Sequence, residues 1–133
     1  MQTNEEMDAR QEQSYKDMEE QTDRHQKLTV HCKKDEFDVY VGRPSIWSNP
    51  WSHVFGYQTI QVENRHKAID NYMKWLIGSD FTDFEQERRK QILERVHELK
   101  GKVLGCWCAP KACHALVLHM FADGMLEPND KED

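Results

Sequence analysis

Hydrophobic and polar positions divide the chain into a polar opening segment, a patterned central region and a short polar end. Residues 1–26 contain no Trp, Phe, Leu, Ile or Val. A segment of this composition cannot supply a hydrophobic core, so we expect a polar arm that is either a solvated helix or disordered. Residues 27–126 carry apolar residues at strand and helix spacing, which predicts a single α/β domain. Residues 127–133 are expected to form a polar tail.

Three short runs in the central region are predicted to be β-strands. Residues 28–32 alternate and are rich in β-branched residues, and residues 38–42 form a similar run that ends at a glycine. Residues 102–107 have the composition of a buried strand. After the second strand, residues 43–56 form a long loop rich in aromatic residues. We expect this loop to fold over the domain as one wall of a binding site.

Helical spacing of apolar residues follows in three places. Residues 64–77 predict a helix with Asn64 as its N-cap, residues 83–99 predict a second, and a third begins at Cys113 or His114. The order of two strands, two helices, a strand and a helix predicts a small open sheet of about three to four strands covered by helices. This order is compatible with a Rossmann-like topology.

The formal net charge is −6, and it limits the partners that we expect. Nonspecific binding to duplex nucleic acid depends on neutralising many phosphates, so we do not expect it here. No apolar run approaches the roughly 18 residues that span a bilayer, and no signal-peptide pattern opens the chain. We therefore expect a cytoplasmic protein without a membrane partner. A single nucleotide in a local basic pocket remains compatible with the charge.

The aromatic loop at residues 43–56 carries groups suited to binding a ligand. Arg43 offers a planar guanidinium for a phosphate, and Asn49 can present its amide. Trp47 and Trp51 offer faces for stacking a base. The alternative is an aromatic plug that closes the core, with Arg43 paired to an acid. Because ligands bind at the carboxyl ends of strands in open α/β sheets, we group this loop with the one that follows the last strand.

Arg65 is a further candidate for binding a ligand. It lies in the first turn of the predicted helix at residues 64–77, where its charge opposes the helix dipole. This placement indicates that the side chain serves a partner, and Asp38 or Asp70 could also be that partner.

The segment Cys106-Trp-Cys-Ala-Pro-Lys-Ala-Cys-His114 contains three of the four cysteines. Without a secretory signal, such a cluster more often binds metal or performs chemistry than forms disulfides. In a catalytic interpretation, Cys108 or Cys113 provides a thiolate nucleophile at a helix start, and His114 acts as an acid or base. In a metal interpretation, Cys106, Cys108, Cys113 and His114 bind zinc.

The spacing of these four residues argues against the metal interpretation. All four lie within nine residues, and Cys113 and His114 are adjacent, so one loop can present four tetrahedral ligands only with difficulty. No metal site is therefore favoured, and zinc stays an option. Cys106 alone is expected to be a buried packing residue.

At these two loops the chain resembles a family of small domains from bacteriophages and bacteria that is catalogued as of unknown function. The resemblance covers roughly residues 28–125 and implies a phage or bacterial origin, but no reaction. Its motifs are Val41-Gly-Arg-Pro-Ser-Ile-Trp-Ser-Asn-Pro-Trp51, Arg65, Tyr72-Met-Lys-Trp-Leu76 and the stretch from Leu99 to His114. The residues that it implies for one shared site are Arg43, Asn49, Arg65, Cys106, Cys108, Cys113 and His114.

Two functions from different classes are compatible with these features. The first is a small enzyme or binding domain that acts on a nucleotide-like phosphate ligand through the two loops, and the sequence does not decide whether it is an enzyme. The second is a phage-encoded interaction protein that binds a host protein, with the cysteine loop structural and optionally bound to zinc.

Overall fold

The computed structural model describes residues 28–54, 56, 59–109 and 111–129. The predicted polar arm at residues 1–26 lies outside this part of the chain. No helix within the described residues has both the length and the apolarity needed to cross a bilayer. The elements in chain order are β1 (Thr29–His31), β2 (Val39–Tyr40), β3 (Trp51–Ser52), β4 (Ile60–Gln61), α2 (Arg65–Ile77), α3 (Gln86–Arg95), the 3-10 helix η2 (Val96–Leu99), β5 (Leu104–Cys106) and α4 (Ala115–Ala122).

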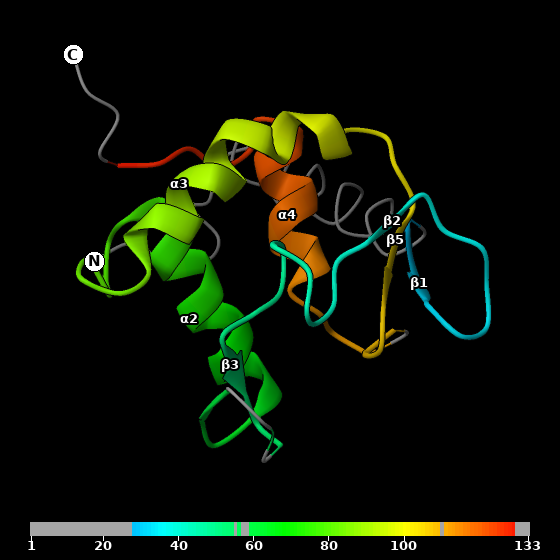
Figure 1. The fold of residues 1–133 in the computed structure, drawn as a ribbon, viewed down its shortest axis with the longest axis horizontal. Helices are drawn as coiled ribbons and strands as arrows, with labels where there is room; N and C mark the ends of the chain where they lie inside the picture. The colour runs from blue at the N-terminus through cyan, green and yellow to red at the C-terminus, as the bar shows by residue number, and fades with distance from the viewer. Residues whose placement is uncertain (1–27, 55, 57–58, 110, 130–133) are drawn as a thin grey trace, which may run out of the picture.

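The three predicted strands form one parallel sheet in which β5 lies between β1 and β2 (Figure 1). Leu104 of β5 is in register with Thr29 of β1 and with Val39 of β2. All residues of β5 are buried, as expected for the central strand of a parallel sheet. In Figure 1 the sheet lies at one side of the molecule and α2, α3 and α4 lie at the other. The predicted class, a small open α/β sheet with helices, is therefore confirmed.

A second, two-stranded parallel sheet forms where the sequence predicted only loop. The backbone N–H of Ile60 donates to Pro50 O at 2.8 Å, and that of Val62 donates to Ser52 O at 2.8 Å. These bonds pair β3 with β4 and hold the end of the aromatic loop beside the start of α2. Strands of two residues have no alternation to detect, which is why the pattern did not predict them.

The helix α2 confirms the sequence prediction at both ends. The side chain of Asn64 accepts a hydrogen bond from Lys67 N at 2.8 Å, and Gly78 ends the helix in the left-handed region with a φ of 93°. The second predicted helix instead begins at Gln86, because positive φ angles at Phe81 and Glu85 keep the preceding turn irregular. Its last turn is the separate 3-10 helix η2.

The hydrophobic core lies between the sheet and the three helices. Its largest fully buried side chains come mainly from the helices and β5, and they include Tyr72, Trp75, Leu99, Leu104 and Leu118. The helix α4 packs against η2 and α2.

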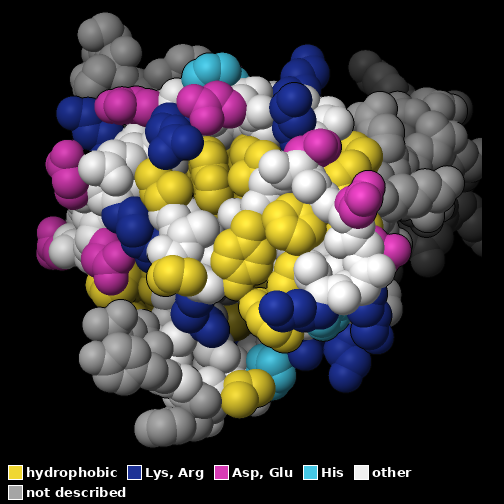
Figure 2. Space-filling view, turned by 45° about the vertical axis from the view of Figure 1, so that its right-hand side comes forward, with side chains coloured by type: hydrophobic (Ala, Val, Ile, Leu, Met, Phe, Trp, Pro, Cys, Tyr) yellow, Lys and Arg dark blue, Asp and Glu magenta, His cyan; other side chains and the backbone are white. Residues whose placement is uncertain are grey.

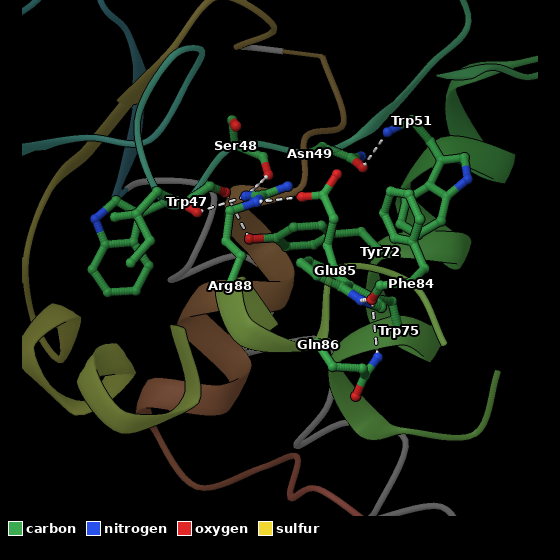
Figure 3. A network of polar contacts seen from close by, with 11 residues as sticks. Trp47, Ser48, Asn49, Trp51, Tyr72, Trp75, Phe84, Glu85, Gln86 and Arg88 are labelled. Atoms are coloured by element: carbon green, nitrogen blue, oxygen red, sulfur yellow. Dashed lines mark hydrogen bonds and ion pairs between the residues drawn. The ribbon is translucent and has the colours of Figure 1, made fainter. Parts of the chain in front are cut away.

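Two arginines of α3 hold other segments in place, and the sequence pattern gave no sign of this. Arg89, which is 5% exposed, donates from Nε to Trp75 O at 2.7 Å and so caps the end of α2. Arg88 donates from Nη1 to Ile46 O at 2.7 Å and to Ser48 O at 2.9 Å (Figure 3). Arg88 thereby fixes the backbone of the aromatic loop.

Candidate functional site

A cavity of about 510 Å³ opens where β2 and β5 end. Its walls are parts of the segment at residues 42–54, the first turn and a half of α2, and residues 106–109 and 111–114 of the segment that we call the cysteine loop, residues 106–114. Almost all of the predicted site residues meet here, because parallel strands end at one edge of the sheet. The predicted residues that line the cavity are Arg43, Asn49, Arg65, Cys106, Cys108, Cys113 and His114.

Asn49 fixes one wall of the cavity through its side-chain amide. It is 7% exposed, its Nδ2 donates to Ala68 O at 3.0 Å, and its Oδ1 accepts from Trp51 N at 3.0 Å. These two bonds join the aromatic loop to α2. The exposed Arg43 then extends from this fixed loop, with its Nη2 at 3.4 Å from the carbonyl oxygen of Asn49.

The structure places Trp47 away from the cavity. Its ring is 4% exposed and lies under the guanidinium of Arg95 at 5.4 Å, while its carbonyl accepts from the Tyr72 hydroxyl at 2.7 Å. The tryptophans that line the cavity are Trp51, which is buried, and Trp107, which is 56% exposed.

Trp107 is a site residue that sequence reasoning missed. Its Nε1 donates to the Tyr40 hydroxyl at 2.9 Å, and its ring meets His31 edge to face at a centroid distance of 5.6 Å. These contacts hold a large aromatic face at the cavity. Its position between Cys106 and Cys108, at the end of the central strand, could have indicated that it belongs to the site.

Arg65 has no acidic partner among the described residues. Its Nη1 lies 3.4 Å from Ala112 O in the cysteine loop. Of the two acids that the sequence offered, Asp38 accepts from Val103 N at 2.8 Å, and Asp70 pairs with Lys74 at 3.0 Å. The guanidinium of Arg65 is therefore available to a ligand.

The lining of the cavity is positively charged. Lys34, Arg43, Arg65 and Lys111 line it, together with His53, and none of its described lining residues is acidic. This is a local concentration of positive charge, because the whole chain has a net charge of −6. In Figure 2, Lys and Arg side chains lie over much of this face, and several gather at the lower right, where no acidic side chain is seen.

The three cysteines of the cysteine loop bring their sulfur atoms together. The Sγ atoms of Cys106, Cys108 and Cys113 all lie within 4.8 Å of one another, and those of Cys106 and Cys113 are 2.8 Å apart. None of the three forms a disulfide. Cys106 is buried, as expected for a packing residue, but its sulfur also belongs to the cluster. Three cysteines are therefore close enough to hold a metal ion.

His114 lies beside this cluster without joining it. Its Nε2 is 2.8 Å from Val41 O, and since a carbonyl only accepts, Nε2 carries the proton. Its Nδ1 is 3.5 Å from the Cys113 sulfur. Burial lowers the pKa of His114, so the ring is neutral near neutral pH. The imidazole thus links the cysteine loop to the end of β2.

The three thiols share charge unequally. Hydrogen bonds from the Cys106 and Cys113 thiols lower the pKa of Cys108 against the opposing effect of burial, and the positive charge of the nearby Arg65 acts in the same direction as the hydrogen bonds. The same hydrogen bonds with Cys106 and Cys108, together with burial, raise the pKa of Cys113. Cys108 is thus the thiol of the cluster whose pKa is lowered, and it is half-buried and lines the cavity.

Fold and site together define a small α/β domain with a cation-lined cavity next to a three-cysteine cluster. The chain belongs to the family described as Domain of unknown function (DUF4326), which matches residues 21–124. This confirms the family type expected from the sequence motifs.

A relative in Enterobacteria phage T4 is the uncharacterized 12.4 kDa protein in the nrdA-td intergenic region. It is 29% identical over 91 residues, which cover 67% of this chain and 70% of the relative. No solved structure matches the chain significantly.

Proposed function

We propose that this domain binds a small, nucleotide-like ligand that carries phosphate, in the cavity between the aromatic loop and the cysteine loop. The observation that carries the proposal is the set of four cationic side chains, Lys34, Arg43, Arg65 and Lys111, around a cavity without a lining carboxylate. Like charges gathered in one place repel one another, so an anionic ligand stabilises this arrangement.

The acidic side chains near Arg65 interact with other groups, which supports the same proposal. Asp38 and Asp70 are occupied by Val103 N and by Lys74, so neither neutralises Arg65. The two arginines come from different walls of the cavity, and guanidinium groups bind phosphate oxygens through paired hydrogen bonds. A phosphate held between Arg43 and Arg65 would lie beside Cys108, which also lines the cavity.

The size of the cavity and its aromatic wall favour a nucleotide over a bare phosphate. A volume of about 510 Å³ lies within the range that is typical of small-molecule sites. Trp107 presents an exposed ring at this cavity, and stacking of a base on an aromatic ring contributes about 1–3 kcal/mol. In the proposal, Trp107 stacks the base while the arginines hold the phosphate.

Calorimetric titration of the full chain with nucleoside 5′-monophosphates, the matching nucleosides and inorganic phosphate tests the proposal. We expect the monophosphates to bind more tightly than either fragment. Arg43→Ala and Arg65→Ala should each weaken binding by about tenfold or more, because hydrogen bonds to charged groups contribute about 1.5–3 kcal/mol. Trp107→Ala should weaken nucleotide binding and leave the affinity for inorganic phosphate unchanged.

Lys67→Ala provides the matched control. It removes one positive charge on the same helix as Arg65, from an exposed residue that does not line the cavity. Affinity should stay within twofold of the wild type. If Lys67→Ala weakened binding as much as Arg65→Ala, the attraction would be nonspecific and the proposal would be wrong. Absence of binding by every nucleotide tested would also overturn it.

The second function predicted from sequence, binding of a host protein, depends chiefly on the polar arm. That arm lies outside the described residues, and no contact of the described residues favours this function over ligand binding.

A further inference from the structure

We infer that Cys106, Cys108 and Cys113 bind one zinc ion, and that the fourth coordination position of this zinc is filled from the cavity. The metal site is independent of the proposed ligand. Only the identity of the fourth ligand rests on the proposed function.

The positions of the three sulfur atoms carry the inference. They lie within 4.8 Å of one another, although they come from the end of β5, the middle of the cysteine loop and the residue pair before α4. In a tetrahedral site with Zn–S bonds of about 2.3 Å, neighbouring sulfurs are about 3.8 Å apart. Binding would therefore move the sulfurs of Cys106 and Cys113 apart by about 1 Å from their present 2.8 Å.

The surroundings of the sulfurs suit thiolate ligands. The first backbone N–H of α4, on Ala115, lies 3.5 Å from the Cys113 sulfur, and the positive end of this helix favours negative charge there. Three thiolates and one Zn²⁺ carry a net negative charge. Arg65 lies at the same cavity and has no acidic partner among the described residues, so it can offset that charge.

The chemistry of the donor set selects the metal. Thiolate sulfur is a soft donor that binds zinc in preference to magnesium or calcium, which prefer oxygen ligands. Among the described residues, no carboxylate or histidine joins the three-sulfur group. The three cysteines are therefore suited to zinc, which is the metal interpretation that the sequence left open beside the catalytic one.

His114 is not the fourth ligand in this arrangement. Its Nε2–H donates to Val41 O at 2.8 Å, and its other nitrogen faces Cys113 at 3.5 Å without joining the sulfur group. All three cysteines line the cavity, so the remaining position is accessible to a molecule inside it. Three protein ligands with an open fourth position distinguish reactive zinc sites from closed structural ones. The fourth ligand would be water, or an oxygen atom of the phosphate-bearing ligand.

The spacing along the chain is unfavourable only for a site with four ligands from the cysteine loop, because adjacent Cys113 and His114 would then both have to bind the metal. With three protein ligands the difficulty disappears, because His114 is left to bind the backbone at the end of β2.

Native mass spectrometry and elemental analysis of the full chain, purified under reducing conditions, test the metal site. We expect about one zinc per chain in the wild type. Cys108→Ser should lose most of the zinc, and because Cys108 is half-buried, its substitution disturbs the core less than that of Cys113. Cys32→Ser is the matched control, since Cys32 is also a half-buried free thiol but lies outside the three-sulfur group. It should keep its zinc.

Cobalt substitution of the wild type gives a readout of the metal site that does not depend on whether a cysteine variant folds. Replacement of the metal by Co²⁺ should give the thiolate-to-cobalt charge-transfer absorption and the visible bands of a tetrahedral ion. These bands should shift when a nucleoside 5′-monophosphate is added, and they should be unchanged in His114→Gln. Arg43→Ala should keep the metal while losing the nucleotide-induced shift, which separates failure of the ligand proposal from failure of the metal site.

Four results would overturn the inference. The first is wild-type protein that binds no zinc and gives no cobalt spectrum, and the second is equal loss of zinc from Cys32→Ser and Cys108→Ser. The third is a fourth protein ligand, revealed by altered cobalt bands in His114→Gln. The fourth is a metal-free chain that is two hydrogens lighter because Cys106 and Cys113 form a disulfide.

Discussion

Removal of the Arg88 side chain should destabilise the domain strongly, although this residue of α3 is partly exposed. Arg88 donates to Ile46 O at 2.7 Å and to Ser48 O at 2.9 Å, and its guanidinium stacks on Trp75 at 5.1 Å (Figure 3). Two hydrogen bonds of about 1 kcal/mol each and a cation–π contact of about 0.5–1 kcal/mol give an expected loss of about 3 kcal/mol for Arg88→Ala. The exposed ion pair with Glu85 adds little.

Thermal and urea unfolding of matched variants measure this loss. A loss of about 3 kcal/mol corresponds to a fall in Tm of about 12 °C or more for a domain of this size. Arg88→Lys keeps the charge but loses the planar guanidinium that lies over Trp75, so it should lose about half as much. Lys90→Ala, at an exposed position of the same helix, should stay within about 0.5 kcal/mol of the wild type. If Arg88→Ala unfolded like Lys90→Ala, Arg88 would not hold the aromatic loop.

Three further substitutions test the packing that positions the site, each by urea unfolding. Tyr72→Phe should cost about 1–3 kcal/mol, because it leaves the buried Trp47 carbonyl without the hydroxyl that donates to it at 2.7 Å. Gly105→Ala should cost about 1–3 kcal/mol, because a Cβ there would lie 2.6 Å from the ring of Phe37. Asn64→Ala should cost about 1 kcal/mol through loss of the cap of α2, whereas Asn64→Asp should restore it. An effect below about 0.3 kcal/mol in any of the three would contradict the role given to that residue.

Much of the fold follows from short-range patterns in the sequence. The helix at residues 65–77 has strong periodicity, an asparagine cap and a terminal glycine, and it forms as predicted. The three strands of the main sheet were also predictable, because each is an apolar run bounded by polar or turn residues. The strands β3 and β4 were not, since their pairing depends on how the chain returns after residue 56.

The location of the site was predictable because parallel strands end at one edge of a sheet. That rule brings the residues after β2 and β5 together. It applies equally to Lys34 after β1, although the sequence analysis did not include Lys34 in the site. The orientation of single aromatic side chains was not predictable. Trp47 turns into the core while Trp107 faces the cavity, and only the path of the loops decides between them.

The cysteine cluster shows a second limit of sequence spacing. Alternation along a strand places Cys106 and Cys108 on one side, which the sequence indicates. The return of Cys113 to within 2.8 Å of Cys106 depends on the turn between them and on where α4 docks against η2 and α2. The spacing of the cysteines along the chain therefore argued against a metal site, whereas the positions of their sulfur atoms in the fold favour one.

Chemical-shift mapping of the ¹⁵N-labelled full chain during titration with a nucleoside 5′-monophosphate tests the central claim most directly, because it locates the bound ligand. We predict that shifts concentrate on the backbone amides of residues that line the cavity, among them Arg43, Asn49, Arg65, Cys108 and His114. The amides of α3 should stay unchanged. Shifts spread over exposed cations of α3, or an unchanged spectrum at millimolar ligand, would contradict the assignment of this cavity as the binding site.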